Sequence, residues 1–178
     1  MERSGSEKFQ RGKNELKLLF LERFQPLLKT TEKALVTHLK EDLLIIGILD
    51  ALEHFTPKNL LTGGERAAMI AHSLTSYPQI SPTSYLIIPI PNCELRGLLV
   101  DHISGLVPKF DKILTPYSDV QKLFIEKGFK SDLCPFTISS FSKKEWLDVL
   151  QNTDLISPAV REYLQSLSIK QRINQVFP

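Results

Sequence analysis

Two short apolar runs, at residues 16–21 and 43–49, constrain the fold of this chain more than any other feature. Neither run alternates between apolar and polar residues, so both are expected to be strands that are buried on both faces. Residues 31–40, which lie between them, place their apolar side chains on one helical face. A buried strand, a helix and a second buried strand in this order predict a right-handed parallel βαβ unit.

Short apolar and amphipathic segments continue to alternate along the rest of the chain. Further strands are expected at residues 85–90, 111–114 and 129–136, and further helices at residues 63–76, 95–106, 118–127, 143–151 and 158–167. We therefore expect an α/β fold, with a Rossmann-like doubly wound parallel sheet and two final helices, over residues 16–178. Residues 1–15 are polar and charged, and we expect them to form a flexible N-terminal arm.

Composition excludes several classes of function. A net charge of +2 gives no reason to expect nucleic-acid binding. The longest apolar run, residues 43–49, is far shorter than the ~20 residues that a membrane-spanning helix needs. Cys93 and Cys134 have no histidine or cysteine near them at metal-ligand spacing. We expect a cytoplasmic protein that binds no membrane and no metal through its own side chains.

Three segments carry a family resemblance. They have the sequences Arg-Phe-Gln-Pro at residues 23–26, Thr-Pro-Lys-Asn followed by Thr-Gly-Gly-Glu-Arg within residues 56–66, and Ile-Ile-Pro-Ile-Pro at residues 87–91. Together they resemble the archaeal-type nicotinamide-mononucleotide adenylyltransferases, members of the nucleotidyltransferase superfamily. The resemblance extends from about residue 16 to about residue 167. It implies the nucleotidyltransferase fold and a role in or near NAD biosynthesis, with ligands bound beyond the carboxyl ends of the strands.

The same resemblance implies that the catalytic groups have been lost. The family loop is Gly-Arg-Phe-Gln-Pro-x-His-x-Gly-His, and its two histidines stabilise the phosphates during adenylyl transfer. In this chain Leu28 and Thr31 stand at the histidine positions, while Glu22 and Thr30 stand at the glycine positions. Leucine donates no hydrogen bond and threonine carries no charge. The loop is therefore expected to keep its structure but to lack the groups that stabilise the phosphates during adenylyl transfer.

Other positions that contact the family's ligands also differ. The family has a catalytic arginine at the end of Ile-Ser-Gly-Thr-x-Ile-Arg, and a gapless count places Lys144 there and Ser139 at the kept serine. Leu99 replaces a tryptophan that stacks on nicotinamide. Residues 115–117 replace Ser-Gly-Asn on the adenine side, and residues 49–51 replace Gly-Ser-Ala. These changes imply a pocket that is partly filled or reshaped.

The sequence leaves more than one function open. In the first hypothesis the protein no longer transfers nucleotides and either binds a nucleotide or phosphate compound weakly or acts as a folded partner, in a homo-oligomer or with another protein. The resemblance then assigns nucleotide binding to the following residues: Arg23, Phe24, Gln25, Thr30 and Ser139. A purely structural interaction protein is a further alternative.

In the second hypothesis the chain is a divergent adenylyl- or cytidylyltransferase with another acceptor. Lys29, Thr31 and Lys144 would then replace the lost catalytic groups, and Mg²⁺ would enter with the nucleotide. Under either hypothesis, a bound anion is expected over residues 24–31, where free backbone N–H groups and the dipole of the first helix attract phosphate. The carboxylate of Glu22 opposes that binding.

Overall fold

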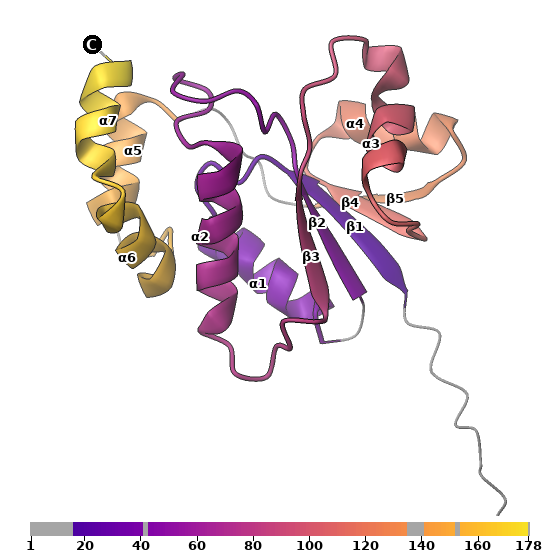
Figure 1. Cartoon of the computed structure of the whole chain (residues 1–178), viewed down its shortest axis with the longest axis horizontal. Helices are drawn as coiled ribbons and strands as arrows, with labels where there is room; N and C mark the ends of the chain where they lie inside the picture. The colour runs from indigo at the N-terminus through magenta and orange to yellow at the C-terminus, as the bar shows by residue number, and fades with distance from the viewer. Residues whose placement is uncertain (1–15, 41–42, 135–140, 152–153, 178) are drawn as a thin grey trace, which may run out of the picture.

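A computed structural model describes residues 16–40, 43–134, 141–151 and 154–177. Five parallel strands form one sheet in the order β3-β2-β1-β4-β5 (Figure 1). The strands are β1 Lys17–Glu22, β2 Leu43–Ile48, β3 Tyr85–Pro89, β4 Lys112–Thr115 and β5 Lys130–Leu133. Because β1 and β2 are adjacent and parallel, the predicted α/β fold and its leading βαβ unit are confirmed.

Helices cover both faces of the sheet. They are α1 Lys29–His38, α2 Gly63–Thr75, α3 Leu99–Leu106, α4 Ser118–Glu126, α5 Lys143–Gln151, α6 Pro158–Ser166 and α7 Ile169–Val176, with the short 3₁₀ helix η1 Arg96–Leu98 before α3. Helices α1 and α2 pack on one face and α3 and α4 on the other (Figure 1). Helices α5 to α7 add an outer layer beside α2 and share its apolar core.

Most predicted elements lie within two residues of the observed ones. The expected helix over 95–106 is divided into η1 and α3, and the expected strand over 129–136 is observed as Lys130–Leu133, with its last two residues outside the described part. The arm expected at residues 1–15 also lies outside it. The two helices expected at 143–151 and 158–167 are observed as α5 and α6, but a third, α7, was not predicted. It follows α6 after a turn in which Ser168 has a φ of 53°. No glycine or proline marks that turn.

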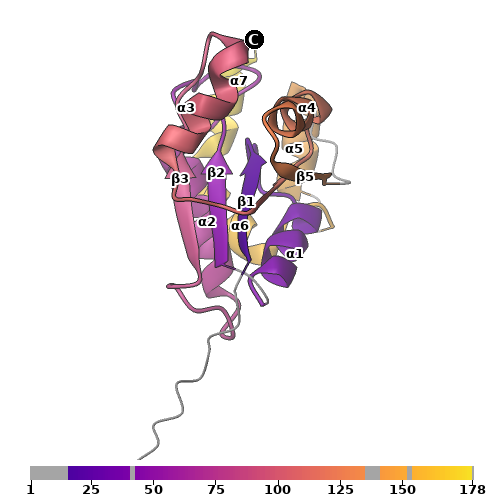
Figure 2. The ribbon, with the colours of Figure 1, turned by 90° about the vertical axis from the view of Figure 1, so that its right-hand side faces the viewer.

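The topology creates one crevice for ligands. Strand β1 lies between β2 and β4, and the chain leaves β1 toward α1 on one face and β4 toward α4 on the other. Figure 2 shows β1 and β2 pointing to the same edge of the sheet. Parallel sheets bind ligands at such a switch point, beyond the carboxyl ends of the strands. Among the described helices, none is long and apolar enough to cross a bilayer.

Candidate functional site

A cleft of about 170 Å³ opens at the carboxyl edge of the sheet, among the loops that follow β1, β2, β3 and β4. Its lining residues are Arg23, Leu49, Asp50, Pro91, Asn92, Cys93, Leu99, Tyr117, Asp119 and Val120. The structure thus gathers around one cleft the positions at 49–50, 99 and 117 where the sequence departs from the family that it resembles. Of the residues predicted to bind a nucleotide, Arg23 lines this cleft.

Arg23 is held in the cleft wall by two neighbours. Its Nε donates to Asp50 Oδ2 at 2.7 Å, and its guanidinium lies over the Tyr117 ring, 5.2 Å from the centroid. Lys58 Nζ lies 3.7 Å from the same Asp50 oxygen. Two cations therefore share one carboxylate, and the arginine side chain is a quarter exposed. Asp119, a second carboxylate of the lining, is paired with Arg96 at 2.6 Å. Three cations therefore lie beside two carboxylates, and the one excess positive charge suits a small anion.

The buried side chain of Arg66 fixes the loops that form the cleft. Its guanidinium donates to the carbonyls of Arg23, Leu49 and Asp50 at 2.7–3.0 Å, and its Nε donates to the Thr62 carbonyl at 3.3 Å. Burial lowers the pKa of Arg66 to about 10, so the group stays charged at neutral pH. One cation thus ties the ends of β1 and β2 to the start of α2.

Those carbonyls belong to a turn region with unusual backbone. Phe24 and Asp50 have φ values of 55° and 52°, in the left-handed region that side chains other than glycine seldom adopt. Arg66 binds the carbonyl just before Phe24 and also those of Leu49 and Asp50. Its hydrogen bonds help to hold both turns, and with them the Arg23–Asp50 pair.

Phe24 and Gln25 serve the scaffold. Phe24 is fully buried against Phe20, with ring centroids 6.0 Å apart. The Gln25 amide donates to the Leu61 carbonyl at 2.8 Å and accepts from the Leu61 amide at 3.0 Å. Both side chains are therefore used inside the protein, and neither lines the cleft. Nucleotide binding by Phe24 and Gln25 stays a prediction, and the contacts of both side chains are those of loop structure.

A cluster of poorly satisfied polar groups lies behind the cleft wall. Glu22, the last residue of β1, is fully buried, and burial raises the pKa of its carboxyl to about 8. The Thr31 hydroxyl partly offsets that rise, although its geometry is poorer than that of a full hydrogen bond. Within the described part of the chain, neither Glu22 oxygen, nor Thr31 Oγ1, nor the Tyr117 hydroxyl has a hydrogen-bond partner. Burial, with Glu22 nearby, also raises the Tyr117 pKa.

The start of α1 is less open than the sequence predicted. Leu28 packs against the apolar core, and Thr31 is fully buried. The backbone N–H of Lys29 donates to the Leu155 carbonyl at 2.8 Å, so it is not free for a phosphate. Thr30 is exposed. The expectation of free amide groups over residues 24–31 therefore fails at Lys29, because the loop before α6 already covers it.

The remaining predicted catalytic residues are not brought to the cleft. None of Lys29, Thr31 and Lys144 lines it. Lys144 is exposed on the first turn of α5, in the outer helical layer. Ser139 lies outside the described residues. The described residues contain no group of histidine, cysteine and carboxylate side chains that could hold a metal ion.

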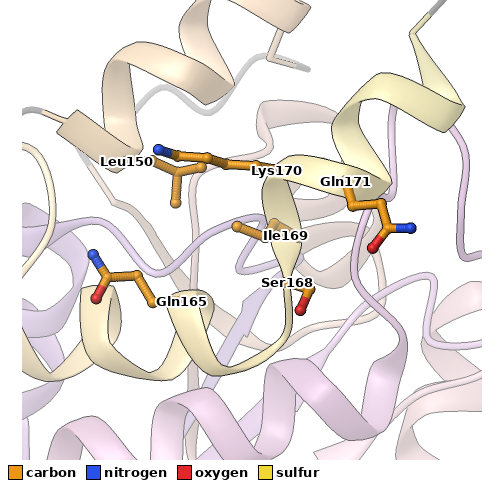
Figure 3. Close-up of a pocket in the computed structure, with 6 residues that line it drawn as sticks. All are labelled: Leu150, Gln165, Ser168, Ile169, Lys170 and Gln171. Carbon is orange, nitrogen blue, oxygen red and sulfur yellow. The ribbon is translucent and has the colours of Figure 1, made fainter.

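Two other hollows differ from the cleft in chemistry. One of about 480 Å³ adjoins it, shares Asn92 and Cys93 with it, and is lined by residues of η1 and α3. The other, of about 400 Å³, lies among α5, α6 and α7 (Figure 3). Lys170 is the one ionisable side chain among its six lining residues, and Figure 3 shows its amine reaching toward Leu150. That hollow holds no catalytic constellation.

Comparison with known proteins identifies sequence relatives over most of the chain. A nicotinamide-nucleotide adenylyltransferase from Pyrococcus furiosus is 32% identical over 172 residues, which cover 89% of this chain and 87% of the relative. The protein of the same name from Pyrococcus horikoshii is 31% identical over the same shares. No protein-family model matches the chain.

A solved structure has the same fold. A bifunctional NMN adenylyltransferase/ADP ribose pyrophosphatase from Francisella tularensis superposes with a TM-score of 0.69 at 14% identity. The match covers 91% of this chain but about half, 52%, of that longer protein. At this identity the likeness is evidence for the fold alone.

Proposed function

Because the chain belongs to the nicotinamide-nucleotide adenylyltransferase family, we propose that it keeps the family's scaffold, does not transfer adenylyl groups, and binds a phosphate-bearing ligand weakly through Arg23. The observation that carries this proposal is the position of Glu22. Glu22 ends β1 with its side chain fully buried on the face of the sheet that α1 covers, at the position where the resemblance places a glycine.

Adenylyl transfer depends on cationic donors. A phosphate of the acceptor attacks the α-phosphate of ATP in line, so the protein supplies positioning and charge stabilisation and needs no nucleophile of its own. One such donor is worth roughly 3–4 kcal/mol where its loss has been measured at other sites. Leu28 and Thr31 supply no charge, and both are packed into the protein. The expected rate is therefore lower by several powers of ten, although such losses seldom add fully.

The cleft keeps what weak phosphate binding requires. Arg23, Lys58 and Arg96 present three positive charges beside two carboxylates, those of Asp50 and Asp119. The adjoining hollow along η1 and α3 has room for the organic part of a nucleotide. One arginine and one exposed lysine support an affinity on the order of 1 mM, or about 4 kcal/mol.

The alternative of a divergent transferase has less support from the geometry. It assigns catalysis to Lys29, Thr31 and Lys144, of which Thr31 is fully buried and Lys144 lies on α5. Mg²⁺ belongs only to that alternative, as the ion that accompanies a nucleoside triphosphate. A cytoplasmic location and a protein partner, including a second copy of the chain, are further parts of the first proposal that rest on the sequence alone.

An activity assay tests the proposal. NAD formation from ATP, nicotinamide mononucleotide and Mg²⁺ is expected to stay at background with the purified chain, and turnover near one per second would refute the proposal. The double variant Leu28→His, Thr31→His is expected to stay inactive, because Glu22 still fills the end of β1. Arg23→Ala is expected to abolish the thermal stabilisation that phosphate gives the native chain.

A further inference from the structure

We infer that Glu22 determines which phosphate ligands the cleft accepts. Its side chain closes the path from Arg23 to the N-terminus of α1, so the cleft takes a single phosphate group and excludes a polyphosphate chain. This inference rests on the proposed binding of phosphate at Arg23. It adds a specificity-determining residue and a ligand class, the phosphate monoesters.

Glu22 lies between the two places where phosphates would have to sit. Leu18 and Phe20 of β1 pack in the core under α1 and α2, so alternation along the strand turns Glu22 toward that same face. There its carboxyl approaches Thr31, on the first turn of α1. The next residue, Arg23, lines the cleft together with Tyr117, whose pKa is raised by burial and also by Glu22. Arg23 covers the Tyr117 ring from the cleft. A chain of phosphates that starts at Arg23 and extends to α1 would occupy the volume of the Glu22 side chain.

Two further groups close the far end of this path. Leu28 precedes α1 as an apolar side chain packed on the core, where it offers a phosphate no hydrogen bond. The Lys29 amide is bonded to the Leu155 carbonyl, whose oxygen repels an anion. Removing Glu22 alone therefore opens room but restores only part of an anion site.

The size of the cleft favours orthophosphate over tripolyphosphate, whereas its charge favours tripolyphosphate. Its volume of about 170 Å³ is below the ~300–1,000 Å³ of most small-molecule pockets, so the cleft itself has room for one small group and the adjoining hollow would take the rest of a monoester. Its net positive wall, by contrast, would attract tripolyphosphate more strongly than orthophosphate if the path were open. Preference for the less charged anion would therefore be evidence for steric closure, because electrostatics alone gives the reverse order.

The experiment compares orthophosphate with tripolyphosphate on the full chain, by amide-resolved NMR titration without Mg²⁺. In the native chain, tripolyphosphate is expected to bind no more tightly than orthophosphate. In Glu22→Gly it is expected to gain at least about tenfold, while orthophosphate changes less than about threefold. Glu22→Gln keeps the volume and removes the acid, so it is expected to keep the native order. Glu22→Ala serves as a second opened variant if the glycine variant does not fold.

Each other result has a distinct meaning. A native chain that already prefers tripolyphosphate by about tenfold, or a ratio unchanged in Glu22→Gly and Glu22→Ala, overturns the inference and leaves the phosphate site intact. A gain of about tenfold in tripolyphosphate binding by Glu22→Gln also overturns the inference, because the charge of Glu22 and not its volume would then exclude polyphosphate. If orthophosphate binds to no chain at about 10 mM, the proposed phosphate site itself is refuted, and the inference with it.

Discussion

Arg66 and Glu22 are both buried ionisable residues at the carboxyl edge of the sheet, but they differ in their hydrogen bonding and in their charge at neutral pH. Arg66 donates to four backbone carbonyls and remains charged. Glu22 has no hydrogen-bond partner for its carboxyl among the described residues, and burial raises its pKa to about 8. The first residue belongs to a segment that the chain shares with its family, and the second stands where the family has glycine.

The two buried groups have opposite effects on the stability of the folded chain. The buried guanidinium of Arg66 uses four of its five N–H donors on loop carbonyls, and removing it would leave those carbonyls unpaired. A buried acid without partners costs stability and is tolerated only when something else depends on it or nothing selects against it. In this molecule that cost falls at the end of β1, beside the cleft. Under the proposed function, the family's scaffold is kept while the space for adenylyl transfer is filled.

The largest expected effect on stability comes from replacing Arg66, the residue whose hydrogen bonds are made. Arg66→Met removes the donor for the carbonyls of Arg23, Leu49 and Asp50, so the free energy of unfolding should fall by at least about 3 kcal/mol. Arg66→Lys keeps the positive charge but not the planar set of donors, so its free energy of unfolding should lie between those of the native chain and Arg66→Met. Urea denaturation measures both. A loss below about 1 kcal/mol for Arg66→Met would mean that these loops do not depend on the guanidinium.

A smaller effect on stability is expected from Glu22, whose carboxyl lacks hydrogen-bond partners among the described residues, and this effect depends on pH. The folded-state pKa of Glu22 is raised from 4.5 to about 8, so between these values the folded chain holds a proton that the unfolded chain has lost. Stability from this group is therefore full below pH 4.5 and is lost as the pH rises to about 8. Tyr117, whose pKa is raised by burial, stays neutral across that window.

Glu22→Gln removes this pH dependence while keeping the shape of the side chain. At pH 8.5 the variant should be more stable than the native chain by roughly 2–4 kcal/mol, and at pH 4 the two should be similar. Thermal unfolding across pH 4–9 measures the difference. Parallel curves for the two proteins would show that Glu22 is not neutral in the folded state.

The smallest expected effect concerns the cap of α2. Thr62 Oγ1 accepts from the Glu65 amide at 3.1 Å, and Glu65 Oε2 accepts from the Thr62 amide at 2.9 Å, which forms a capping box. Thr62→Ala should cost about 1 kcal/mol. Ser157→Ala removes a similar cap from α6 and serves as the matched control. Because Arg66 holds α2 to the cleft loops, only Thr62→Ala should also weaken phosphate binding.

Local patterns predicted most of the fold. The continuous apolar runs gave β1 and β2, and the pair Thr62 and Glu65 predicted the start of α2. Helix α7 was missed because a single left-handed serine, Ser168, separates it from α6 without a glycine or proline. Its apolar residues at 169, 173 and 176 have helical spacing and were the signal for another short helix.

The site was less predictable because its interactions are distant in sequence. The resemblance identified Arg23, the changes at Glu22 and Thr31, and residues 115–117 on the adenine side, but no local pattern shows that the Tyr117 ring lies under the guanidinium of Arg23. The four-carbonyl role of Arg66 is equally invisible, since backbone oxygens carry no sequence signal. The covering of the Lys29 amide depends on a carbonyl more than a hundred residues away, at Leu155.

The central claim is that the cleft, and not the start of α1, is where this scaffold still holds a phosphate. The most direct measurement is an orthophosphate titration that follows every assigned backbone amide by NMR. The largest shifts are expected at Arg23, Asp50 and Tyr117, with half-saturation on the order of 1 mM. Shifts centred on Thr30 and Thr31 would contradict the claim, because they would mean that the end of β1 is open and that the helix still binds an anion.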